Sequence, residues 1–225
     1  MHRYAAYATE LIGTFFLVFT VGTSLLIGSP LAPVAIGAIL MVMVYAGGHI
    51  SGGHYNPAIT MGVLIRRRIA VADAVGYWVV QLVAGLLAAF LARWVVNPRT
   101  VATPDISGRP LLTALLVEAL FTFALVYVML NVATSSSNPN NSFYGLAIGF
   151  TVAAGAIAIG PVSGAALNPA VTAGIAVLGL LAWSKAVLYL IVQVLAGVVA
   201  GYAFLALNPD EAPARRAEEQ MTPHR

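Results

Sequence analysis

Two asparagines in matching local settings are the residues best suited to chemistry in this sequence. Each opens an Asn-Pro-Ala motif that follows a Ser-Gly pair: Ser51-Gly52 with Asn56-Pro57-Ala58, and Ser163-Gly164 with Asn168-Pro169-Ala170. Asparagine is a favoured helix N-cap and proline is favoured at the first helical position, so each motif predicts a helix start. Each side-chain oxygen would accept from its own helix, which leaves the NH₂ group free to donate to a passing oxygen. This chemistry binds hydrogen-bond acceptors and does not make or break covalent bonds.

Other reactive side chains are few. His49 and His54 lie in and beside the loop that precedes the first motif, and the chain contains no cysteine. We expect His54 to line the mouth of a passage and to pair across it, and His49 to be an interfacial histidine satisfied by backbone. The spacing reveals no nucleophile–base set and no metal cluster. The sequence therefore predicts a protein that is not an enzyme and has no metal or other cofactor.

The composition indicates a chain whose solvent is lipid. Of its 225 residues, 60% are hydrophobic and only 8% are charged, whereas soluble domains carry about 25% charged residues. The net charge of +3 does not predict nucleic-acid binding, because charges are few and most basic residues lie in loops beside apolar segments.

A helix that spans a bilayer needs about 20 mostly apolar residues. Six segments qualify, at about 5–28, 33–50, 72–96, 111–133, 143–161 and 184–207. The first is longer than the apolar region of a signal peptide, so we expect it to be retained. Residues 1–207 would form one domain, followed by a charged, solvent-facing tail at 208–225.

Two further stretches, 51–71 and 162–183, are too short to cross and too apolar to be ordinary loops. A helix of about ten residues is ~15 Å long, which is half of the hydrocarbon core. Half-helices that enter the membrane from opposite faces would explain both stretches.

The chain contains an internal repeat, with units at about 5–98 and 111–207. The segment 77–85 recurs at 189–197 with the offset that relates the two motifs, and the Glu-x-x-x-Thr-Phe segment at 10–15 recurs at 118–123. Three spans in each unit make the second unit inverted, which places a site near the midplane. The predicted fold is an all-α polytopic membrane protein with six transmembrane helices and two re-entrant half-helices.

Basic residues orient this fold. Seven lie on one side of the predicted membrane and four on the other, and the short loop that contains Arg66, Arg67 and Arg68 carries the most weight. The positive-inside rule then places both termini in the cytoplasm. We expect a multi-pass protein of the cell membrane.

The N-termini of the two half-helices would face each other and form a polar region inside a passage that lipid surrounds. Their positive dipole ends disfavour cations there. Small residues before the motifs would let the backbone run extended, with carbonyl groups bared as acceptors: Gly52, Gly53, Gly164, Ala165 and Ala166. This pattern favours a path for small neutral hydroxylated molecules.

Glu10 and Glu118 are the acids that lie deep in the spans. An intramembrane acid suggests a proton relay or an ion site. Their repeat-related positions favour a different role, in which each carboxylate braces its own half-helix by accepting loop N–H bonds. A transport carboxylate is the alternative.

The segment 49–58, the second Ser-Gly-x-x-x-Asn-Pro-Ala and the paired Glu-x-x-x-Thr-Phe segments resemble the aquaporin and glycerol-facilitator family over residues 5–207. The resemblance implies six spanning helices with two half-helices, passive conduction, and a homotetramer with one pore in each subunit.

The resemblance also implies a selectivity filter of four residues. Counted without gaps from the two asparagines, these are Ile36, Ala156, Ala165 and Val171. Water-selective members carry an aromatic residue, a histidine and an arginine here, whereas this chain has no polar filter side chain. We therefore expect a wider, apolar filter that resembles the branches for glycerol-like polyols or neutral metalloid acids such as arsenous acid. The alternatives are a water or dissolved-gas pore, a transporter coupled through Glu10 or Glu118, and a structural membrane protein with a closed pore.

Overall fold

The computed structural model describes residues 3–101, 103 and 106–211, and this part of the chain is helical. The helices are α1 (Arg3–Leu26), α2 (Ala32–Ser51), α3 (Pro57–Ile65), α4 (Val71–Val96), α5 (Gly108–Thr134), α6 (Tyr144–Ser163), α7 (Pro169–Val177), α8 (Trp183–Leu207) and the short 3₁₀ helix η1 (Pro209–Glu211). Six of them are long and apolar enough to cross a membrane: α1, α2, α4, α5, α6 and α8. The predicted six spans and two half-helices are therefore confirmed.

Helix ends depart from the predicted bounds in one informative place. The expected span 143–161 stopped at Pro161, but α6 continues to Ser163. A proline inside a helix lacks an N–H donor and its ring clashes with the carbonyl group four residues earlier. In agreement with this, α6 ends at Ser163, less than one turn beyond Pro161. Gly164 then ends α6 with a φ of +88°, a left-handed conformation that glycine adopts without steric cost.

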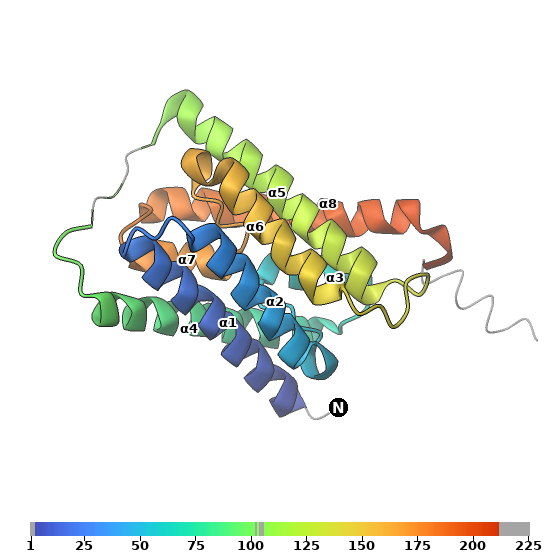
Figure 1. Ribbon diagram of the computed structural model, residues 1–225. Helices are drawn as coiled ribbons and strands as arrows, with labels where there is room; N and C mark the ends of the chain where they lie inside the picture. Colours follow the sequence, from blue (N-terminus) through green and yellow to red (C-terminus); the bar gives the residue numbers. More distant parts are fainter. Residues whose placement is uncertain (1–2, 102, 104–105, 212–225) are drawn as a thin grey trace, which may run out of the picture.

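The two halves of the chain exchange their short helices. In each half the first long helix packs on the second and third: α1 on α2 and α4, and α5 on α6 and α8. The half-helix α3 packs mainly on α8, and α7 packs mainly on α4, so each short helix lies against the other repeat. Figure 1 shows the start of α1 and the end of α8 on one side of the molecule, which we call the termini side.

Glycines make this exchange possible. A Cβ atom added to Gly197 on α8 would lie 2.4 Å from the carbonyl oxygen of Ala58, and one added to Gly85 on α4 would lie 2.7 Å from that of Ala170. Backbone atoms therefore touch where the first turn of each half-helix meets the other repeat. The same pair of contacts in both repeats shows that the inverted symmetry extends to the packing.

We expect Gly197→Ala to lower thermal stability. The new methyl group would overlap a backbone oxygen that cannot rotate away, and such overpacking costs about 1–3 kcal/mol. Gly160→Ala on α6 is the matched control, because a Cβ atom there meets nothing within 4 Å. Thermal unfolding of both variants in detergent checks the prediction; equal midpoints would contradict it.

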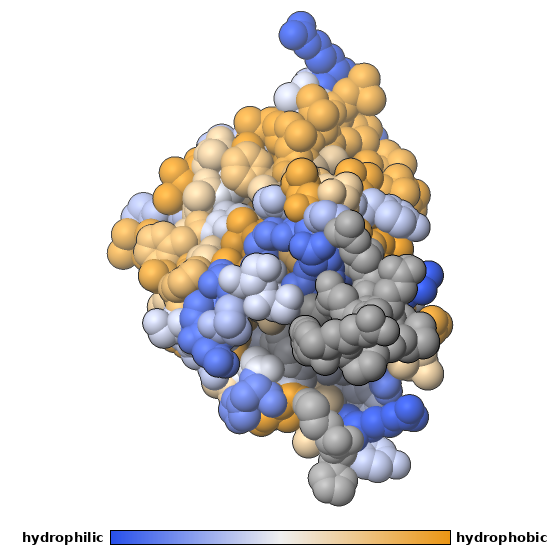
Figure 2. Space-filling view, turned by 90° about the vertical axis from the view of Figure 1, so that its right-hand side faces the viewer, coloured by the Kyte–Doolittle hydropathy of each residue, from blue (hydrophilic) through white to orange (hydrophobic). Residues whose placement is uncertain are grey.

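The surface agrees with a lipid environment. Large apolar side chains point outward along the long helices, among them Phe90, Trp94, Phe150 and Ile191. Figure 2 shows the termini side, where hydrophilic residues gather in the middle and lower part of the view and hydrophobic residues lie mainly above them.

The predicted solvent-facing tail begins differently from expectation. Residues 209–211 form η1; Pro209 and Asp210 are exposed as expected, but Glu211 is buried, so the prediction was wrong for that residue. The remainder of the tail, 212–225, lies outside the described residues.

Candidate functional site

The two Asn-Pro-Ala motifs begin α3 and α7. Asn56 and Asn168 have extended backbone angles, and their side-chain oxygens accept from the N–H groups of Ala58 and Ala170, each at 2.8 Å. Pro57 and Pro169 are the first helical residues, where the missing N–H has no intrahelical partner to lose. The predicted N-caps are confirmed.

The amide NH₂ groups join the repeats to each other. Asn56 Nδ2 donates to the carbonyl oxygen of Leu167, and Asn168 Nδ2 donates to that of Tyr55, both at 2.9 Å. The expectation that each NH₂ group is wholly free was therefore wrong. An amide has two N–H donors, so the second remains for a passing molecule.

Glu10 and Glu118 hold equivalent positions behind the two loops. Glu10 accepts at one oxygen from Ser51 Oγ and His54 N (2.7 and 2.9 Å), and at the other from Tyr55 N and Gln81 Nε2 (2.6 and 2.9 Å). Glu118 makes the four corresponding bonds, to Ser163 Oγ, Ala166 N, Leu167 N and Gln193 Nε2, at 2.8–2.9 Å. These are the loop contacts that the bracing hypothesis requires.

The loops before the motifs are not extended, contrary to expectation. Left-handed φ angles occur at Gly52 (+89°), Gly53 (+63°) and Ala165 (+49°), and also at the bulky residues Tyr55 (+48°) and Leu167 (+51°). Such angles cost free energy in residues other than glycine and persist where surrounding contacts hold them. Here the glutamates bind the N–H groups of Tyr55 and Leu167, while the asparagines bind their carbonyl oxygens.

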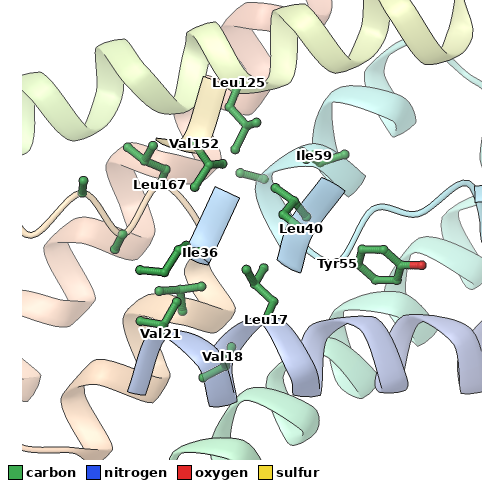
Figure 3. Close-up of a cluster of buried hydrophobic side chains, with 14 of the residues drawn as sticks. Leu17, Val18, Val21, Ile36, Leu40, Tyr55, Ile59, Leu125, Val152 and Leu167 are labelled. Carbon is green, nitrogen blue, oxygen red and sulfur yellow. The ribbon is translucent and has the colours of Figure 1, made fainter. Parts of the chain in front are cut away.

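A cavity of about 600 Å³, the outer cavity, runs from the side opposite the termini to both asparagines. All four residues of the expected filter line it, on α2, α6, the second loop and α7: Ile36, Ala156, Ala165 and Val171. Gly164 and Ala166 line it as well. Its wall is largely apolar; Figure 3 shows Leu17, Val21, Ile36, Leu40 and Val152 among the side chains gathered there.

His54 lines this cavity as well. It is buried, its Nδ1 lies 3.0 Å from Thr60 Oγ1, and its ring meets that of Tyr77 edge to face. Thr60 belongs to the half-helix that follows His54, so the predicted pairing across a mouth was wrong. The loop turns the imidazole back onto its own helix, within reach of the threonine hydroxyl.

A second cavity of about 320 Å³, the inner cavity, opens on the termini side. Gly52 and the exposed His49 line it, together with residues 132–134 at the end of α5 and residues 135 and 138–141 between α5 and α6. Gly53 instead lies against Gly48 and Val44 of α2. The vestibule residues expected from the sequence are thus divided between two cavities and the helix packing.

Sequence reasoning missed the polar residues that support the glutamates. Gln81 and Gln193 donate to them, and the hydroxyl groups of Tyr77 and Tyr189 donate to the carbonyl oxygens of Ser51 and Ser163 (2.6 and 3.0 Å). All four residues belong to the repeated segments 77–85 and 189–197. The sequence signal that could have identified them is a polar residue that recurs at the same position of an apolar helix in both repeats.

Comparison with known proteins agrees with this geometry. The family model described as major intrinsic protein matches residues 1–204, with an overlapping match at 146–223. The chain is 39% identical to a glycerol uptake facilitator protein-like 6 from Lactiplantibacillus plantarum, over 76% of this chain and 82% of that protein. It is 36% identical to aquaporin TIP2-3 from Zea mays, over 89% of this chain and 88% of that protein.

A solved structure shares the fold. The X-ray structure of the aquaglyceroporin from Plasmodium falciparum superposes with a TM-score of 0.73 at 19% identity, over 97% of this chain and 99% of that one. The family match, the two relatives and the paired half-helices lead to one conclusion: the chain belongs to the major intrinsic protein family, and it is a passive membrane channel for small solutes rather than an enzyme.

Proposed function

We propose that this channel conducts small uncharged solutes bulkier than water, above all neutral metalloid acids such as arsenous acid and glycerol-like polyols, with some water. The observation that carries the proposal is the set of four apolar residues around the outer cavity: Ile36, Ala156, Ala165 and Val171. Val171 directly follows the second Asn-Pro-Ala motif, so its assignment to the filter does not depend on an ungapped count along the chain.

An apolar constriction discriminates between solutes by the hydrogen bonds that each solute loses on entering it. Water loses hydrogen bonds beside methyl groups and regains none from them. A polyol or a metalloid hydroxide presents a larger, less polar surface to the wall, and its hydroxyl groups can still form hydrogen bonds further along the pore. The partners there would be the remaining N–H donors of Asn56 and Asn168, which line the same cavity.

The relatives support this solute class without specifying it. One relative is named glycerol uptake facilitator protein-like 6. Others are aquaporins, including aquaporin NIP2-2 from Zea mays, 33% identical over 95% of this chain.

Passive conduction also follows from the arrangement of Glu10 and Glu118. Each carboxylate oxygen accepts two hydrogen bonds from the loop and the neighbouring helix, and both side chains are fully buried. A carboxylate that is held in this way supports bracing over transport coupling.

The proposed setting is the cell membrane, with both termini in the cytoplasm and four chains in a homotetramer with one pore in each subunit. The Arg66–Arg68 loop follows α3 on the termini side, which is the cytoplasmic side by the positive-inside rule. The surrounding partner is the lipid bilayer.

Stopped-flow light scattering on proteoliposomes tests the proposal, with water, glycerol and arsenous acid compared on one preparation. We expect entry of both solutes well above that of protein-free vesicles, unchanged by proton or sodium gradients. Fast water flux without solute entry would instead establish the alternative, a water channel. Solute uptake that depends on a proton or sodium gradient would establish coupled transport.

A further inference from the structure

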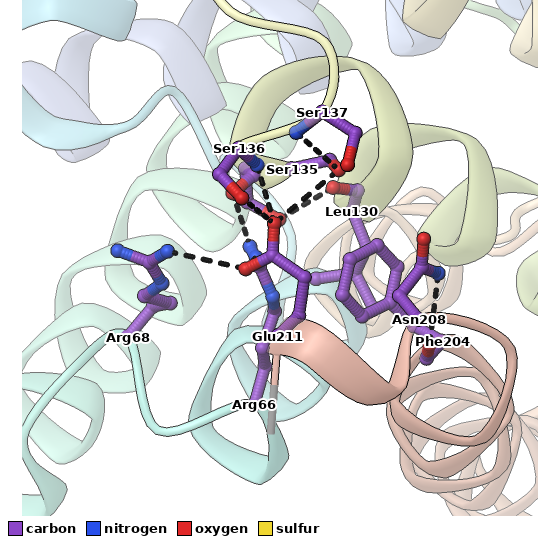
Figure 4. A network of polar contacts seen from close by, with 10 residues as sticks. Arg66, Arg68, Leu130, Ser135, Ser136, Ser137, Phe204, Asn208 and Glu211 are labelled. Atoms are coloured by element: carbon purple, nitrogen blue, oxygen red, sulfur yellow. Dashed lines mark hydrogen bonds and ion pairs between the residues drawn. The ribbon is translucent and has the colours of Figure 1, made fainter. Parts of the chain in front are cut away.

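A buried ion pair joins three segments on the termini side of the molecule. Arg66, which ends α3, and Glu211 in η1 lie 2.7 Å apart, with side chains 0% and 2% exposed. The guanidinium of Arg66 also donates to the carbonyl oxygen of Thr134 at the end of α5 and lies 4.3 Å from the centre of the Phe204 ring. Figure 4 shows Arg66 and Arg68 approaching the Glu211 carboxylate from one side and Ser136 from the other.

Glu211 also holds the segment that follows α5. Its second oxygen accepts from both the backbone N–H and the hydroxyl group of Ser136, while Arg68 lies 3.5 Å from the first. Other hydrogen bonds of this segment are internal, such as that of Asn138 N to Ser135 O, or run to neighbouring helices. Asn141 Nδ2 donates to the carbonyl oxygen of Val132 in α5 at 2.6 Å, and the Tyr45 hydroxyl group of α2 donates to that of Ser142, just beyond the segment, at 3.1 Å. Glu211 therefore links the segment to α3 and to η1.

The segment held in this way forms a wall of the inner cavity. Thr134, Ser135, Asn138 and Asn141 line one side, and the end of α2 with Gly52 lines the other. A Cβ atom on Gly52 would lie 3.1 Å from Nε2 of His54, which lines the outer cavity. The two cavities thus adjoin at His54, and a molecule that passes it meets the wall fixed by Glu211.

We propose that Glu211 is a positioning residue, which sets the mouth of the channel on the termini side by holding the segment 135–141 against Arg66. A buried charge that loses its partner is strongly unfavourable, so removal of the carboxylate drives Arg66 toward water and releases Ser136. The inference rests on the chain being a channel and does not depend on which solute it conducts.

The absence of cysteine in the chain allows a direct test with the full-length protein in lipid nanodiscs. One reporter is Asn138→Cys in the wall of the inner cavity, and the other is Ser29→Cys, which lines the outer cavity at the opposite end. Thiol modification rates are compared in the wild-type background, in Glu211→Gln and in Ser136→Ala, which keeps the ion pair. Asp210→Asn is the matched control, since it removes an exposed acid from the same short helix.

We expect Glu211→Gln to raise the modification rate at position 138 by about ten-fold and to leave position 29 unchanged, because the opening is local. Ser136→Ala should raise the rate at position 138 by a smaller factor, and Asp210→Asn should not raise it. In proteoliposomes without reporters, the flux of whichever of water or glycerol the wild type conducts should change at least about two-fold in Glu211→Gln. Equal rates at position 138, faster modification at both positions, an equal effect of Asp210→Asn, or an unaltered flux would each overturn the proposal.

Discussion

Replacing Val171 by arginine is expected to slow the entry of glycerol and arsenous acid into proteoliposomes by about ten-fold or more, a barrier increase of ~1.4 kcal/mol. Val171 and Ala165 are buried in the wall of the outer cavity beside the second motif, and the partly buried Ala156 lines the same wall. A guanidinium there would occupy the space left by the two alanines and would add a fixed cation with five N–H donors. Water, being smaller, should lose less of its flux than either solute.

Val171→Met is the control that separates bulk from charge. Methionine is long and flexible but has no charge and no strong donor. We expect it to reduce solute flux by less than arginine does. If Val171→Arg leaves glycerol, arsenous acid and water flux as in the wild type, position 171 does not line the narrowest part of the pore, and the proposed filter is wrong.

The second large effect is expected on stability, from Glu10→Leu and Glu118→Leu. Each change leaves two buried backbone N–H groups and two polar side chains without their acceptor. Each buried donor left unsatisfied costs about 1–3 kcal/mol, so each variant should lose about 4 kcal/mol or more. Size-exclusion profiles and thermal unfolding in detergent, followed by tryptophan fluorescence, measure the loss.

Asp73→Asn provides the comparison for the loss of an acid. Asp73 lies near the start of α4, partly exposed, where it accepts from the Tyr7 hydroxyl group and pairs with Arg3. Such a surface pair is worth about 0–1 kcal/mol, so this variant should unfold close to the wild type. Stable Glu10→Leu or Glu118→Leu protein whose transport has lost a dependence on pH would contradict bracing and favour a transport carboxylate.

Sequence alone determined the helices and their inverted arrangement, for local reasons. Span length follows from the run of apolar residues, and half-helix length follows from where the run after each Asn-Pro-Ala motif stops. Pro57 and Pro169 mark the starts because proline suits the first turn. The repeat of Glu10 as Glu118, at matching positions, also predicted that their roles would be alike.

Contacts between the halves were decided by tertiary structure. Asn56 binds the loop of the second repeat and Asn168 that of the first, which no spacing within one repeat could indicate. The packing of α3 on α8 depends on the contact of Gly197 with Ala58, two residues far apart in the chain. Left-handed angles at Tyr55 and Leu167 are likewise imposed from outside the loops, since their own side chains disfavour them.

Two charged residues show most clearly what the sequence determines and what only the tertiary structure decides. Composition and hydropathy assign Arg66 and Glu211 to a polar loop and a polar tail, because these scales treat a charge as a group that seeks water. In the structure the two side chains neutralise each other in a buried pair and join the end of α3 to η1 and to the segment after α5. A charge can leave water only when its partner is brought beside it, and the fold alone brings together two residues that are 145 positions apart in the sequence.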